Sequence, residues 1–185
     1  MRALLVGRNR ALLRTVQSLT DLIRTASAPT ELDPYRAYVL GICGHLADVL
    51  TRNLDDLGRG PEAILEDVLS NTQLATRLAQ LLSARIASPI LRASAADRLC
   101  LRTITWLHRQ HPVTTSVPAA FGDGHTAVWP FIQVVPIYFM PAAEQRSLLF
   151  QPLVFHEFGH LLYAYHQPEM DALVSDATPF LMGSA

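Results

Sequence analysis

The sequence contains no lysine and only two cysteines, and its charges nearly cancel. All 15 basic residues are arginine, against 16 acidic residues, so the formal net charge is −1. Because nucleic-acid binding depends on strong positive patches, this balance argues against a nucleic-acid partner. Cys43 and Cys100 are too few for a disulfide framework, and we expect both to be buried thiols. The absence of lysine, together with abundant alanine and leucine, indicates coding bias in a GC-rich bacterial genome.

We expect neither an export signal nor a membrane span in this sequence. The N-terminus, MRALLVGRNR, has too short an apolar run for a signal peptide, so we expect a cytoplasmic protein. Residues 124–143 carry no Asp, Glu, Lys or Arg over a length that could cross a bilayer. However, prolines interrupt this segment, and β-branched and aromatic residues dominate it. We therefore predict a broken strand or hairpin there, and no membrane span.

The pattern of apolar residues divides the chain near residue 111. Residues 1–111 show helical spacing throughout, whereas residues from Pro112 onward contain loop and strand chemistry before a last apolar helix. The expected fold class is α+β, mainly α, with a helical region at 1–111 and a second region at 112–185. The two regions could pack as one domain.

The segment LVFHEFGHLLYAYH, residues 153–166, contains an H-E-x-x-H motif. His156 and His160 are one helical turn apart, so a helix places both imidazoles on one face, within reach of one zinc ion. Glu157 projects about 100° further round the helix, where it can take a proton from a zinc-activated water. The motif therefore predicts two metal ligands, His156 and His160, and one catalytic base, Glu157.

Apolar residues on both sides of the motif predict that the helix from about Pro152 to Tyr165 is buried. A buried Glu157 without a partner would be costly, which strengthens the case for a functional site. Gly159 is also costly inside a helix, so we expect close backbone packing around it.

These residues resemble the zincin metallopeptidases, whose active-site helix carries the sequence seen here as HEFGH. The resemblance covers about residues 131–166. In zincins, an extended edge strand that binds the substrate backbone precedes this helix, and FIQVVPIYF, residues 131–139, has the corresponding place. Pro136 fits an edge strand because proline cannot donate to a ladder. The resemblance implies zinc bound by His156 and His160, with Glu157 as general base.

The third zinc ligand is not evident, although a catalytic site uses three protein ligands and a water. His166 has the spacing of the third histidine of metzincins, but Tyr163 replaces the glycine of that pattern. Pro168 suggests that the helix ends near His166, which favours a cap or surface histidine there.

The acidic residues that follow leave further alternatives. Asp171 has the spacing of the aspzincin ligand, and Glu169 and Asp176 lie on the same expected helix after Pro168. Gluzincins instead take a glutamate from a later helix. The third ligand thus stays open between His166, Glu169, Asp171 and a residue outside this chain. We expect a gluzincin-like protein that is truncated before its third ligand.

The expected function is zinc-dependent hydrolysis of peptide bonds through a metal-bound water, with a peptide or protein as substrate. The alternative is a catalytically inactive zinc-binding domain or a helical protein-interaction domain. Because two imidazoles alone hold zinc weakly, we expect weak zinc binding and slow or absent hydrolysis by this chain.

Overall fold

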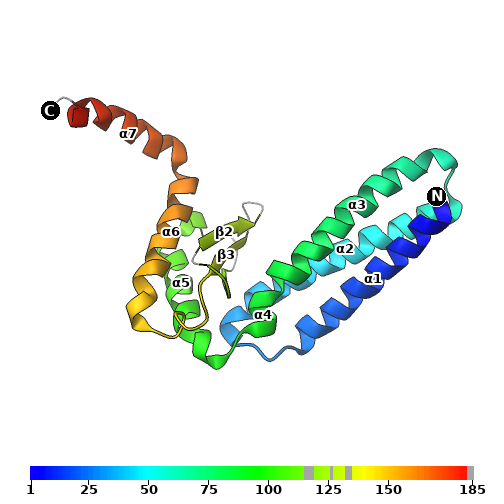
Figure 1. Cartoon of the computed structure of the whole chain (residues 1–185), viewed down its shortest axis with the longest axis horizontal. Helices are drawn as coiled ribbons and strands as arrows, with labels where there is room; N and C mark the ends of the chain where they lie inside the picture. The colour runs from blue at the N-terminus through cyan, green and yellow to red at the C-terminus, as the bar shows by residue number, and fades with distance from the viewer. Residues whose placement is uncertain (115–118, 126, 132–134, 183–185) are drawn as a thin grey trace. The chain divides into compact units, whose positions relative to one another are not determined.

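The computed structural model describes residues 1–114, 119–125, 127–131 and 135–182 (Figure 1). The chain is mainly helical, with one three-stranded sheet among these residues, which confirms the expected fold class in outline. Contacts divide it into two compact units, Met1–Ala95 and Ala96–Ala185. This boundary lies before residue 111, because the last helix of the expected helical region packs with the sheet and the motif helix.

The first unit is a bundle of three long helices that lie side by side, namely α1 (Arg2–Thr25), α2 (Asp33–Arg59) and α3 (Leu65–Leu81) (Figure 1). A π-helical turn, Leu82–Ile86, and the short α4 (Ser88–Arg92) follow. Apolar side chains at helical spacing on α1 and α2 form much of the core, namely Leu5, Val16, Leu19, Ile23, Val39, Cys43, Leu46, Leu50 and Leu57. Burial at this period is what stabilises helices whose individual propensities are modest.

Among its described residues, the second unit contains three α-helices and the sheet. The helices are α5 (Arg98–Gln110), α6 (Gln151–Tyr165) and α7 (Gln167–Met182). The strands are β1 (Ala120–Gly122), β2 (Ala127–Phe131) and β3 (Val135–Phe139). Cys100 on α5 is a buried free thiol, as is Cys43 on α2, and burial raises the pKa of both thiols.

The strand order is β1-β3-β2, so β3 lies in the centre of the described sheet. β1 pairs parallel to β3, and β2 pairs antiparallel to it. The expectation that residues 131–139 supply the edge strand is therefore wrong, because this segment includes β3, which is paired on both sides. The strand beside α6 is β2, and residues 132–134 of the expected segment lie outside the described residues.

Two prolines face each other in this sheet without a loss of ladder bonds. Pro130 of β2 is opposite Pro136 of β3, and antiparallel pairs alternate between hydrogen-bonded and non-bonded ones. Because neither proline has an N–H, their pair must be a non-bonded one. The described pairing with β1 begins at Ile137, one residue beyond Pro136. By the same alternation, the N–H of Val128 points sideways from the edge of the described sheet, away from β3.

The uncharged segment 124–143 contains β2 and β3, so the prediction of strands there is confirmed for its described residues. Among the described helices, none combines the length and the apolar character that a membrane crossing requires.

Candidate metal centre

The motif lies on α6, and the predicted helix from about Pro152 to Tyr165 is confirmed. Pro152 is in the first turn, where its fixed φ suits a helix and its missing N–H is not needed. The helix ends at Tyr165 with His166 as its C-cap, near the predicted end, and α7 begins directly afterwards with Pro168 in its first turn.

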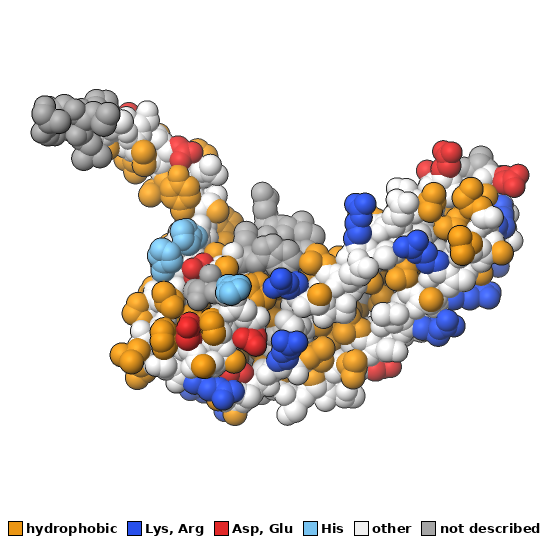
Figure 2. Space-filling model, in the orientation of Figure 1, with side chains coloured by type: hydrophobic (Ala, Val, Ile, Leu, Met, Phe, Trp, Pro, Cys, Tyr) orange, Lys and Arg blue, Asp and Glu red, His pale blue; other side chains and the backbone are white. Residues whose placement is uncertain are grey.

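Only one face of α6 is buried, so the prediction of a buried helix is wrong. The buried residues, Gln151, Val154, Phe158 and Leu161, recur every three or four positions. On the other face, Phe155 is 47% exposed and Tyr163 is 41% exposed. Figure 2 shows histidine side chains at the surface in this region, next to hydrophobic ones. The apolar residues around the motif thus predicted more burial than the helix has.

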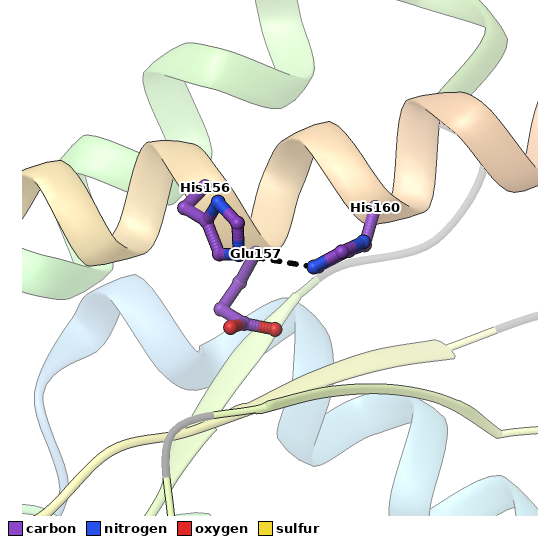
Figure 3. Close-up of side chains that lie close together, drawn as sticks. All are labelled: His156, Glu157 and His160. Atoms are coloured by element: carbon purple, nitrogen blue, oxygen red, sulfur yellow. Dashed lines mark hydrogen bonds between the residues drawn. The ribbon is translucent and has the colours of Figure 1, made fainter.

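His156 and His160 point toward one another from the same side of α6 (Figure 3). Their Nε2 atoms are 3.0 Å apart, and their ring centroids are 4.6 Å apart. Two nitrogens bound tetrahedrally to zinc at about 2.0–2.1 Å would be about 3.3 Å apart. The predicted convergence of the two rings is therefore present, and a small rotation of either ring would admit an ion. Both residues are exposed, so the pair is open to solvent.

Glu157 lies beside this pair, with its side chain directed toward the sheet (Figure 3). One ligand atom from each of the three residues lies within 4.8 Å of the others, and this is the one such cluster among the described residues. The Oε2 atom of the half-buried Glu157 accepts a hydrogen bond from the backbone N–H of Val128 at 2.8 Å. The outward-pointing N–H of β2 thus partly compensates the carboxylate for its burial.

The other candidate ligands do not join this cluster. The Nδ1 atom of His166 lies 3.7 Å from the Oε2 atom of Glu169, and both side chains are exposed. Asp171 accepts a hydrogen bond from the hydroxyl of Tyr163, and this bond raises the pKa of the tyrosine. Each of these three candidates therefore has a local interaction at the junction of α6 and α7. The residue closest to completing a three-ligand set is Glu157 itself.

Gly159 has no close neighbour, although close backbone packing was expected around it. The residue is exposed, and a Cβ atom built on it would meet nothing within 4 Å. The expectation is wrong for contacts within this chain, because Gly159 lies on the open face of α6.

The sequence did not predict the buried hydrogen bonds of His108 beside the motif helix. The two ring nitrogens of His108 on α5 lie 2.9 Å from the carbonyl oxygen of Thr114 and 3.1 Å from the hydroxyl of Tyr138. Its ring meets that of Phe158 edge-on, with centroids 5.2 Å apart. Burial lowers the pKa of His108 and raises the pKa of Tyr138, so both side chains are uncharged near neutral pH.

A signal for His108 was present in the sequence. It falls four residues after Ile104 and eight after Cys100, on the buried face of α5. That spacing predicts a buried histidine, but it says nothing about a partner 30 residues away.

No family model matches the chain, and neither the curated proteins nor the solved structures contain a match to it.

Proposed function

We propose that this chain binds zinc between His156 and His160 and hydrolyses peptide bonds, with Glu157 as the general base. The observation that carries the proposal is the approach of the two Nε2 atoms to 3.0 Å beside a carboxylate. When bound, zinc acts as a Lewis acid that activates water and polarises a carbonyl group. A peptide or protein remains the expected substrate, from the resemblance of HEFGH to the zincin motif.

The donor types and their placement fit zinc. Neutral imidazoles are common zinc ligands, and the exposed face of the pair leaves room for water and substrate. The two histidines supply two of the three protein ligands that catalytic zinc sites use. Weak zinc binding therefore remains our prediction for this chain.

Glu157 is suited to the role of base because only one of its two carboxylate oxygens accepts the hydrogen bond from Val128. Its Oε2 atom accepts the N–H of Val128, which restricts the rotation of the carboxylate. The Oε1 atom is then available to take a proton from water and to return it to the leaving amine. If Glu157 were instead a metal ligand, the cluster would have three ligands but no base among its members.

The test is hydrolysis of a fluorogenic peptide library by the zinc-loaded full chain, compared with Glu157→Gln. Loss of general-base catalysis should lower kcat/KM by about 10²- to 10⁴-fold. Zinc binding should be unchanged, because the amide leaves both histidines intact. Glu169→Gln removes a carboxylate outside the cluster and should keep the activity. Equal hydrolysis by Glu157→Gln and the unchanged chain would refute the assignment of the base.

A catalytically inactive binding domain is the second candidate, and α7 favours it. The described part of α7 is exposed along its length, including the apolar residues Met170, Leu173 and Val174. A helix with uncovered apolar side chains is typical of a protein-interaction element. Tight zinc binding without any hydrolysis would favour this candidate over the first.

A further inference from the structure

Five residues form a ring of contacts that includes the hydrogen bond between Val128 and Glu157. Val128 donates to Glu157, and the next residue, Phe158, packs its ring against His108. His108 bonds to Tyr138, which lies directly opposite Val128 in the β2–β3 pair. The buried His108 therefore contacts Phe158, which follows Glu157 in the chain, and Tyr138, which is opposite Val128 in the sheet.

The donors and acceptors in this ring can be assigned. The carbonyl oxygen of Thr114 can only accept, so the Nδ1 atom of His108 carries the proton and donates to it. The Nε2 atom is then an acceptor, and the hydroxyl of Tyr138 donates to it. Both side chains are buried, so a lost bond here would not be replaced readily by water.

The position of β2 matters because this strand offers Glu157 a single backbone donor among its described residues. Along β2, the N–H points away from β3 at every second residue. The next such position after Val128 is Pro130, which has no N–H. A two-residue shift of β2 that moved Pro130 to the place of Val128 would leave Glu157 without this donor, and a shift by one residue would turn the N–H toward β3. In the observed register, Val128 supplies the hydrogen bond.

We propose that His108 and Tyr138 are positioning residues for Glu157. They fix the β2–β3 pair against α5 and α6 and so hold the N–H of Val128 at the carboxylate. The role in hydrolysis rests on the proposed function, whereas the hydrogen bond itself can be measured without metal or substrate.

The test is the NMR signal of the Val128 amide in the metal-free full chain. The chemical shift of this proton in Glu157→Gln is the reference for a weakened bond, because the variant replaces the charged acceptor with a neutral one. In Tyr138→Phe and His108→Leu, the amide proton should move most of the way to that reference. His108→Gln can present an acceptor to Tyr138, so its Val128 signal should stay near that of the unchanged chain.

A matched control removes a buried tyrosine hydroxyl elsewhere. Tyr35 donates to the carbonyl oxygen of Ile86 at 2.8 Å in the first unit, and Tyr35→Phe should leave the Val128 signal in place. A folded Tyr138→Phe chain whose Val128 signal does not move would overturn the proposal. So would an equal movement in Tyr35→Phe, which would indicate general loosening.

A second readout uses zinc-loaded protein. Tyr138→Phe should lower kcat by about tenfold with little change in KM or zinc affinity, because only the orientation of the base is disturbed. A loss of zinc affinity with no change in the Val128 signal would contradict positioning. If neither the unchanged chain nor any variant hydrolyses peptides, the proposed function fails. The Val128 amide signal still tests the positioning role.

Discussion

The backbone N–H of Val128 donates to the Oε2 atom of Glu157 at 2.8 Å, which joins the edge strand β2 to the motif helix α6. Val128 is available for this bond because its N–H lies outside the β2–β3 ladder, as the opposed prolines Pro130 and Pro136 require. The register of a small sheet thus determines whether the carboxylate of the motif has a partner.

Replacement of the donor tests this relationship directly. Val128→Pro removes the N–H, while Val128→Ala keeps it and changes only the side chain. Because a hydrogen bond to a charged group contributes about 1.5–3 kcal/mol, we expect kcat to fall by about tenfold or more in Val128→Pro. Steady-state kinetics of the zinc-loaded variants would measure this. Equal rates for both variants would show that the N–H does not support the base.

The stability of the chain should fall in mild acid because His108 is buried. Burial lowers the pKa of His108 in the folded state, and this effect outweighs the hydrogen bond to the backbone of Thr114, which raises it. The unfolded chain has a histidine pKa of about 6.5, so below that pH it takes up a proton more readily than the folded chain does. Folding is therefore disfavoured as pH falls below about 6.5, by at most about 1.4 kcal/mol per pH unit for this group.

Urea unfolding at pH 8 and pH 5.5 checks the effect of His108. His108→Gln cannot take up this proton, so it should lose less stability between the two pH values than the unchanged chain. Above about pH 8 the group contributes almost no pH dependence, because it is neutral in both states. The same loss in both proteins would mean that His108 does not contribute.

Replacement of Gly159 and of Gly122 by alanine should change the stability of the chain in opposite directions. Gly159 is exposed within α6 and has open space beside it, so Gly159→Ala should stabilise the helix by about 0.5–1 kcal/mol. At Gly122 in β1, a Cβ would lie 2.6 Å from the ring of Phe139, so Gly122→Ala should destabilise the chain. Thermal unfolding of both variants would measure the difference. A lower Tm for Gly159→Ala would show that something contacts this position.

The parts of the site that follow from local geometry could be predicted from the sequence. The convergence of His156 and His160 depends on the pitch of a helix, and the end of α6 just before His166 depends on the proline that follows. Both expectations hold because neither requires knowledge of the distant chain.

The parts that depend on tertiary packing could not be predicted. The central place of β3 is set by its pairing with β1, and the exposure of α6 is set by which elements cover it. The contact of His108 with Tyr138 joins residues 30 positions apart, so no local pattern marks it. Apolar composition around the motif was a poor guide, because exposed Phe155 and Tyr163 look the same in sequence as core residues.

Zinc titration of the metal-free chain tests the central claim most directly, with His156→Ala, His160→Ala, His166→Ala and Asp171→Ala as variants. We expect one zinc per chain, bound weakly, with binding lost in His156→Ala and in His160→Ala because each removes half of the imidazole pair. His166→Ala and Asp171→Ala should bind zinc as the unchanged chain does, because neither residue belongs to the cluster. Binding that survives the loss of His156 and of His160, or that disappears with His166 or Asp171, would contradict the account.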